Sequence, residues 1–186
     1  MKRIHFFTGL SGLCLWTIAL GCTQKKIHSE LELEKPPQKV ITAAVAEIHS
    51  VNQGKLNGKA HFTRVGSDAV EVIVEVTGLV PPGKHGIHVH QVGDCGGVGA
   101  SKAGGHFDLH QSSHGDPSAE PHHSGDLGNI QANKKGKGFA KLMLKGIELD
   151  KLLDKSLVIH GKEDDLKTQP SGNSGDRIGC GIIKAE

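Results

Sequence analysis

Residues 70–77 read Val-Glu-Val-Ile-Val-Glu-Val-Thr, and this stretch indicates the fold class. Valine occupies every second position, so one face of an extended segment is apolar and the other is mostly polar. Similar β-branched runs recur at residues 40–48, 61–65, 86–92, 139–144, 156–160 and 177–184. Turn residues separate these runs at Asn57-Gly58, at residues 81–83 and at residues 134–138. Seven or eight short strands with such turns predict an all-β protein, an antiparallel sandwich or barrel.

Three other segments do not follow the strand pattern. Residues 146–154 are the only helix-like segment, whereas residues 93–127 and 161–176 are long, polar and glycine-rich. Loops of this length need a constraint inside a compact domain. The first loop contains the groups that can supply one: Cys95, His106, His110, His114, His122, His123 and Asp126. We therefore expect a disulfide and a metal ion to hold it.

Composition excludes several function classes. The chain has 22 basic and 20 acidic residues, and two of the basic ones, Lys2 and Arg3, open an apparent export signal. The remaining charge is balanced, which leaves no basic surface for nucleic acid. Aromatic residues are 3% of the chain and tyrosine is absent, so base-stacking platforms are not expected. The 13 histidines are the unusual feature.

The first 22 residues have the pattern of a signal peptide, with a basic start followed by an apolar stretch at residues 6–20 that is short for a membrane span. They end Ala-Leu-Gly-Cys, which resembles a bacterial lipoprotein signal and predicts acylation of Cys22. Simple cleavage and a retained anchor are the alternatives. Residues 23–38 are a polar linker and residues 39–186 the domain. The sequence thus predicts an exported protein, periplasmic or in the cell envelope, that contacts the membrane only through a lipid anchor.

Only two cysteines, Cys95 and Cys180, remain after this signal. In an oxidising compartment a disulfide between them is expected, with two free thiols as the alternative. Closing so long a loop stabilises a domain by roughly 4 to 5 kcal/mol on the chain-entropy model. The chain has no CxxC motif, which argues against thioredoxin-like redox chemistry.

The segment His88-Val89-His90 lies in a predicted strand. Alternate side chains of a strand share a face, so both histidines point outward while Ile87 and Val89 point into the core. Two imidazoles on one face can chelate a metal ion. Taken alone, the pair is equally compatible with two surface histidines.

Five segments in order extend this observation: HGIHVHQVGDC (85–95), AGGHFD (103–108), HHSGDLGN (122–129), SLVIHGKEDD (156–165) and GNSGDRIGCGII (172–183). Together they resemble the copper,zinc superoxide dismutases over residues 39–185. Cys95 directly follows Asp94, as in bacterial secreted members. The resemblance implies a Greek-key β-barrel with a metal site on its outside, beneath two long loops, and an enzyme that converts superoxide to O2 and hydrogen peroxide.

The resemblance also implies the ligands. Copper would be held by His88, His90, His106 and His160; zinc by His106, His114, His123 and Asp126. An all-imidazole set suits Cu(II), and a closed set of four marks a zinc ion that is not hydrolytic. For the second zinc ligand the loop offers His110 or His114, and the eight-residue step from His106 favours His114. The H-x-G-D spacing selects His123 over His122.

Other residues receive roles from the same resemblance. Asp164 would join a copper ligand, His88, to a zinc ligand, His114. Arg177 would hold the superoxide anion, and the shared ring of His106 would accept and deliver a proton. Lys162 and Lys167 lie on the second loop, where they either steer superoxide or are simply solvated.

Two alternatives remain at this point. A secreted copper- and zinc-binding buffer or carrier on the same fold would be expected to lack Arg177 or a copper ligand, and none is missing. A hydrolase is the weakest alternative, because neither G-x-S-x-G nor H-E-x-x-H occurs. A homodimer is possible, but the sequence defines no interface.

Overall fold

The computed structural model describes residues 40–186. The predicted signal, the acylated Cys22 and the linker lie outside the described residues. The strands are β1 (Ala43–Ser50), β2 (Asn57–Val65), β3 (Ala69–Thr77), β4 (Gly83–His90), β5 (Asp126–Ala132), β6 (Gly138–Lys145), β7 (Ser156–His160), β8 (Arg177–Ile182) and β9 (Lys184–Ala185). A 3₁₀ segment, η1 (Val98–Ala103), and one short helix, α1 (Leu149–Leu152), complete the elements.

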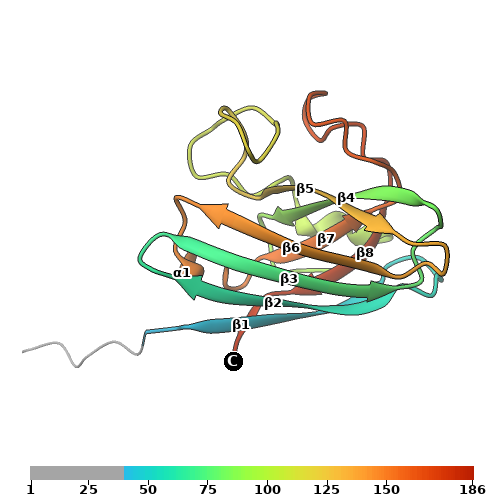
Figure 1. Ribbon diagram of the computed structural model, residues 1–186, viewed down its shortest axis with the longest axis horizontal. Helices are drawn as coiled ribbons and strands as arrows, with labels where there is room; N and C mark the ends of the chain where they lie inside the picture. The colour runs from blue at the N-terminus through green and yellow to red at the C-terminus, as the bar shows by residue number, and fades with distance from the viewer. Residues whose placement is uncertain (1–39) are drawn as a thin grey trace, which may run out of the picture. The chain divides into compact units, whose positions relative to one another are not determined.

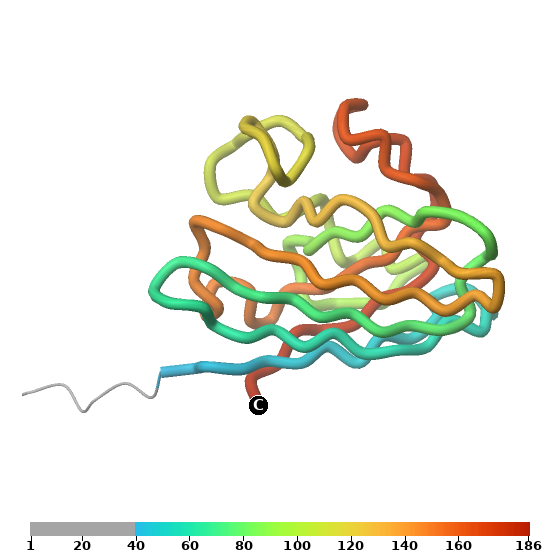
Figure 2. The backbone as a smooth tube through the Cα atoms, in the orientation of Figure 1, coloured from blue at the N-terminus to red at the C-terminus, as the bar shows by residue number. Residues whose placement is uncertain are grey.

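All strand pairs are antiparallel, and the sheet closes on itself. The order is β2-β3-β6-β5-β4-β7-β8-β1, and β1 pairs again with β2. Because β3 pairs with β6 and β4 with β7, the two connections between the halves cross over neighbouring strands, which is Greek-key order. Figures 1 and 2 show the resulting barrel, with the predicted fold class confirmed.

The alternation in β3 has the predicted consequence. Val70, Val72, Val74 and Val76 are buried, while the residues between them face outward and are more exposed. Facing apolar side chains of the other strands, among them Phe62 of β2 and Ile159 of β7, complete one core inside the barrel. Burial of this apolar surface is the main stabilising term of such a domain.

Two local predictions were wrong. Asn57-Gly58 is not a turn but the start of β2. The glycine occurs there because a side chain at position 58 would collide with the Glu75 carbonyl of β3. Strand β5 was not predicted, since Gly128 adopts a left-handed φ of 77° and interrupts the period-two pattern. The short helix predicted within residues 146–154 is confirmed as α1.

The two long loops are present as predicted, at residues 91–125 and 161–176, and both lie on the same side of the barrel (Figure 2). The disulfide between Cys95 and Cys180 is also confirmed and ties the first loop to β8. Within residues 40–186, no helix has the length and apolarity needed to cross a membrane.

Candidate metal centre

Strand β4 directs His88 and His90 to the face opposite the core, while Ile87 and Val89 are fully buried inside the barrel. Both histidines are nevertheless buried, because the loops cover this face. A stretch of the first loop pairs with β4: the Phe107 N–H donates to the Val89 carbonyl at 2.8 Å. This pairing sets His106 beside the two histidines of β4.

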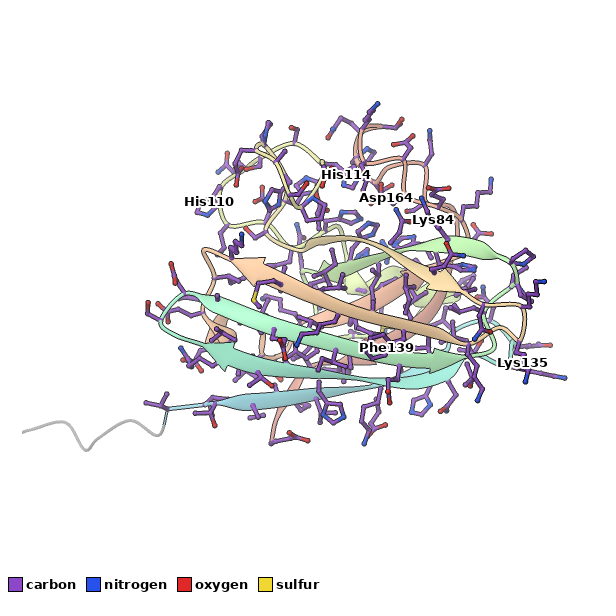
Figure 3. The ribbon with its side chains drawn as sticks, viewed as in Figure 1. Lys84, His110, His114, Lys135, Phe139 and Asp164 are labelled. Atoms are coloured by element: carbon purple, nitrogen blue, oxygen red, sulfur yellow. A yellow bond between two sulfur atoms is a disulfide. The ribbon has the colours of Figure 1, made fainter. Side chains whose placement is uncertain are left out.

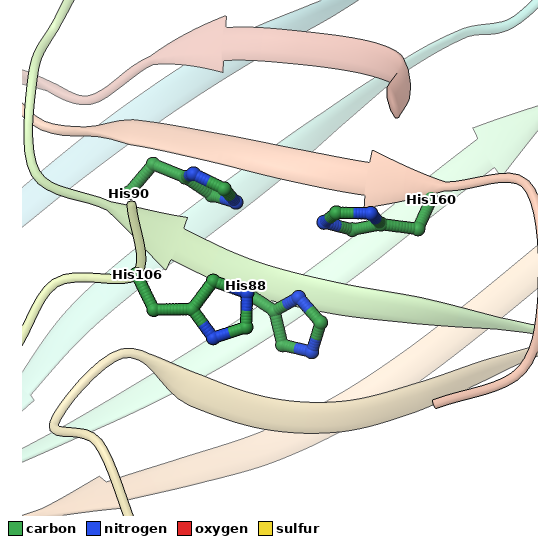
Figure 4. A group of neighbouring side chains, drawn as sticks. All are labelled: His88, His90, His106 and His160. Carbon is green, nitrogen blue, oxygen red and sulfur yellow. The ribbon is translucent and has the colours of Figure 1, made fainter. Parts of the chain in front are cut away.

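His160 completes the group from the adjacent strand. Strand β7 pairs with β4, with His88 opposite Val158, so the end of β7 lies next to the middle of β4. The ring centroid of His88 lies 4.0 Å from that of His106 and 4.8 Å from that of His160. Figure 4 shows the four rings facing one another. One ligand nitrogen from each of His88, His90, His106 and His160 lies within 4.8 Å of all the others.

Hydrogen bonds fix which nitrogen of each ring is free. The Nδ1–H of His90 donates to the Gly104 carbonyl at 2.9 Å, and that of His160 donates to the Gly175 carbonyl at 3.1 Å. The Nε2–H of His88 donates to Asp164 at 2.8 Å. The opposite nitrogens, and Nε2 of His106, are buried and have no hydrogen-bond partner among residues 40–186. Four lone pairs thus meet in one buried space, which fits a metal ion.

A second group adjoins the first through the other nitrogen of His106. Its Nδ1 lies 2.7 Å from one oxygen of Asp126, and Nδ1 of His114 lies 3.1 Å from the other oxygen. The His114 contact lacks hydrogen-bond geometry, so this buried nitrogen is also without a partner in the described chain. His88, His106, His114 and Asp126 form a compact set of possible ligands, all buried.

His123 is the least closely held of the predicted zinc ligands. Its Nδ1 is 3.4 Å from Asp126, and its ring centroid is 5.3 Å from that of His106, but it lies outside the compact set. Its backbone N–H donates to Asp126 at 2.9 Å, which anchors the residue beside the group. Zinc prefers four ligands, and His123 is a possible fourth ligand beside His106, His114 and Asp126.

The competing histidines lie elsewhere. His110 is exposed on the first loop, whereas His114 is buried between the two loops (Figure 3). His122 is partly buried: its Nδ1–H donates to the His123 carbonyl at 2.8 Å, and Nε2 lies 3.4 Å from Glu120. Neither His110 nor His122 belongs to the compact groups.

Asp164 forms hydrogen bonds with one histidine of each group. One of its oxygens accepts a hydrogen bond from His88 at 2.8 Å and the other accepts one from His114 at 2.9 Å. Its approach depends on Gly172, where a side chain would collide with the carboxylate of Asp164. The second loop therefore orients one ring in each group.

Comparisons with known proteins agree with this site. The family model "Copper/zinc superoxide dismutase (SODC)" matches residues 56–183. An extracellular superoxide dismutase [Cu-Zn] of Brugia pahangi is 38% identical over 75% of this chain and 74% of its own. A superoxide dismutase [Cu-Zn] of Paramecium bursaria Chlorella virus 1 is 35% identical over 95% and 93%. The crystal structure of the clock protein EA4 superposes with a TM-score of 0.72 at 30% identity, covering 80% of this chain and 98% of that one.

The chain belongs to the copper/zinc superoxide dismutase family. As a member it is an enzyme that dismutates superoxide, with copper and zinc as its cofactors. The disulfide and the extracellular relative indicate an exported protein.

In this superoxide dismutase the guanidinium of Arg177 is held at two points. Nη1 donates to the Ala100 carbonyl at 2.7 Å and Nη2 to the Gly104 carbonyl at 2.6 Å. Gly104 also accepts the hydrogen bond of His90, so the same carbonyl positions the arginine and one of the four histidines of the first group. Arg177 lines a pocket of about 510 Å³. The disulfide lies close by, because Cys180 packs against Ala100.

Burial controls the protonation of the histidine group in the metal-free protein. It lowers the pKa of His90 to about 2 and that of His160 to about 4, and it lowers the pKa of His88 and of His106 as well. Burial is the largest single influence on Asp126 and acts to raise its pKa, but the hydrogen bond and charge interaction with His106, the Gly115 N–H and the charge interaction with His114 together outweigh burial, so this pKa lies below its usual range. Neutral imidazoles beside a carboxylate are the protonation states that bind metal.

One residue at the site was missed by the sequence analysis. The side-chain amide of Gln169, in the second loop, forms two hydrogen bonds with the backbone of His114 in the first. The two residues are 55 positions apart, and a contact to backbone atoms leaves no pattern in the partner's sequence.

Proposed function

We propose that this enzyme dismutates superoxide at a copper ion held by His88, His90, His106 and His160, beside a zinc ion held by His106, His114, His123 and Asp126. The observation that carries the assignment is the set of five buried imidazole nitrogens without partners among the described residues: Nδ1 of His88 and His114, and Nε2 of His90, His106 and His160. Unpaired buried polar atoms are costly, so their convergence requires a compensating ligand.

When bound, copper would supply one-electron redox chemistry, by which one superoxide ion leaves as O2 and a second takes up two protons to leave as hydrogen peroxide, and zinc would supply a fixed positive charge beside His106. The chain's own residues supply the rest. His106 offers one nitrogen to each group, and Nε2 is the atom that accepts a proton and later delivers it to the product. For Nε2 to exchange a proton in this way, Nδ1 of the same ring must stay bound on the side of Asp126.

Arg177 binds the anion. Two of its five N–H donors are used by the Ala100 and Gly104 carbonyls, which fixes the guanidinium plane and leaves the other donors for superoxide. A charge-assisted hydrogen bond to a small anion is stronger than a neutral one. The four rings are buried, so bulk water is excluded from them. The anion would therefore approach through the pocket that Arg177 lines.

Lys162 and Lys167 belong to the proposal as steering groups for the anion. The aliphatic part of the Lys162 side chain lies against Gly175, whose carbonyl accepts the hydrogen bond of His160, so Lys162 projects from the loop next to the four proposed copper ligands. Asp176, exposed and lining the same pocket as Arg177, opposes this attraction. Lys167 is exposed further along the loop. Steering of this kind weakens as salt screens the charges.

The N-terminal predictions complete the proposal. Residues 1–22 are a lipoprotein-type signal, Cys22 becomes the acylated first residue, and residues 23–38 tether the domain in the periplasm or cell envelope. Mass spectrometry of protein isolated from membranes should find a mature chain that begins at a lipid-modified Cys22. A mature chain that begins at another residue, or lacks lipid, contradicts this part. A homodimer is tested by sedimentation velocity.

The catalytic proposal is tested with the purified full chain. The metal-free protein, reloaded with copper and zinc, should bind one of each and remove superoxide far faster than the same concentration of free copper. Arg177→Leu serves as a variant that keeps every proposed metal ligand. Loading of both metals without dismutation above free copper would contradict the proposal and favour a metal carrier.

A further inference from the structure

His114 is the proposed zinc ligand with the least support from its own loop. It lies in a stretch of the first loop without regular secondary structure, between η1 and β5. Its ring is held by a hydrogen bond to Asp164, but neither its backbone N–H nor its carbonyl bonds to any other backbone group of the described chain. Something else must hold the backbone from which this buried ring projects.

The side chain of Gln169 supplies this support. Its Oε1 accepts the His114 N–H at 2.8 Å, and its Nε2 donates to the His114 carbonyl at 2.8 Å. The second hydrogen of the same NH2 group donates to the Lys167 carbonyl at 3.1 Å. The amide thus pairs with one residue as a neighbouring strand would, and its orientation is fixed because the backbone offers one donor and one acceptor.

The chemistry of this contact is specific to glutamine at this position. Glutamate can accept from the His114 N–H, but it would set a carboxylate oxygen against the His114 carbonyl. Methionine has a similar length and shape but can pair with neither group. Asparagine is one methylene shorter and would not reach from the same backbone position.

We propose that Gln169 is a positioning residue for zinc, which acts by holding the backbone of His114 in the binding geometry before the metal arrives. This inference rests on the proposed zinc site. With Gln169, the second loop holds His114 at its backbone, and Asp164 of the same loop holds its ring. Without Gln169, zinc binding must also order this part of the first loop, and the lost conformational entropy lowers the affinity.

The experiment compares Gln169→Met, Gln169→Glu and a control, Gln53→Leu, in the full chain with the disulfide intact. Gln53 is exposed on the β1–β2 connection and takes part in no hydrogen bond of the described structure. Zinc and copper affinities are measured by competition with chelators. Hydrogen exchange of the His114 amide is measured in the metal-free protein.

Gln169→Met should weaken zinc binding by roughly 10- to 100-fold, the usual cost of losing a residue that supports a metal ligand. Copper affinity should change by less than about threefold, well below the loss expected for zinc, because Gln169 contacts none of the four proposed copper ligands. Exchange of the His114 amide should become faster. Gln169→Glu should lose less affinity and keep the amide protected, since it retains one of the two bonds. Gln53→Leu should change nothing.

Unchanged His114 exchange in Gln169→Met would overturn the inference, as would unchanged zinc affinity. An equal loss of copper and zinc would also overturn it, because that result indicates general loosening of the loops. If the wild-type protein bound no zinc, the proposed function would fail, while the exchange measurement would still decide whether Gln169 holds His114.

Discussion

The barrel and the two loops that cover it are stabilised in different ways. In β3 every residue pairs with β2 and all but Thr77 also pair with β6, and every second side chain is a buried valine. In residues 161–176 many hydrogen bonds instead join a side chain to backbone, as with Asp164, Asp165 and Gln169. The first arrangement follows from a repeating pattern, whereas the second depends on individual residues. The metal ligands lie where the two meet, so their geometry depends on both.

The largest effect is expected from removing the cross-link between the loop and the barrel. Cys95→Ser with Cys180→Ser should lower the free energy of unfolding by about 2 to 5 kcal/mol. Because Cys180 packs against Ala100, which holds Arg177, kcat/KM should fall as well. Urea unfolding and superoxide removal are measured on the same samples. A variant that loses stability but keeps full activity would mean that the disulfide serves only the barrel.

A change at the point where β8 contacts the first loop should act on catalysis alone. Arg177→Leu should lower kcat/KM roughly 10- to 100-fold, the value of one or two hydrogen bonds to a charged group. The content of copper and zinc should not change, since Arg177 contacts carbonyls and none of the proposed ligands. Arg64→Leu, at a distant ion pair with Asp150, is the control. Loss of copper from the Arg177 variant would contradict a role in anion binding.

A change confined to the barrel should do the opposite. Val74→Ala removes two methyl groups from a fully buried site and should cost about 1 to 2 kcal/mol of stability. The metal affinities and kcat/KM should stay at wild-type values at a temperature where the protein remains folded. A fall in kcat/KM without unfolding would show that barrel packing is transmitted to the histidines.

The stability of the metal-free protein should depend on pH through the buried histidines beneath the loops. The pKa of His160 is lowered to about 4 and that of His90 to about 2 by burial, from an unfolded value of 6.5. Between pH 6.5 and about 4 the unfolded chain binds more protons than the folded one, so protonation favours unfolding. Stability should be fully present above pH 6.5 and decline as the pH falls toward 4. Urea unfolding with a chelator present, at a series of pH values, tests this; a flat profile would contradict the burial of neutral rings.

The smallest effect is expected from the exposed end of the second loop. Lys162→Ala should lower kcat/KM by about twofold at low ionic strength, and the difference should vanish as salt rises past the range where the Debye length is about 10 Å. Asp176→Asn should raise kcat/KM by a similar factor, because it removes a negative charge beside Arg177. Salt profiles that are identical in both variants and the wild type would remove these residues from the account.

The sequence predicted those features that depend on repetition or on few choices. The alternation of valines in β3 correctly predicted that these valines are buried, and the two cysteines that remain after the signal correctly predicted one disulfide. Strand β5 was missed because the left-handed Gly128 breaks the alternation. Asn57-Gly58 was read as a turn, although the glycine is needed for close approach of β3.

The candidate site could be predicted only where a motif carries it. His88 and His90 follow from strand geometry, but the remaining ligands came from a family resemblance, and their metal roles remain proposals. Gln169 was not predictable, because it recognises backbone atoms of a residue 55 positions away. Contacts of this kind depend on how two loops meet, which local sequence does not encode.

The central claim is that one imidazole ring, that of His106, lies between two different metal ions. Anomalous diffraction from crystals of the copper- and zinc-loaded protein, recorded at the absorption edge of each metal, tests it most directly. We expect a copper peak next to Nε2 of His106 and a zinc peak next to Nδ1. A single peak, both metals on one side of the ring, or His106 turned away from both peaks would contradict it.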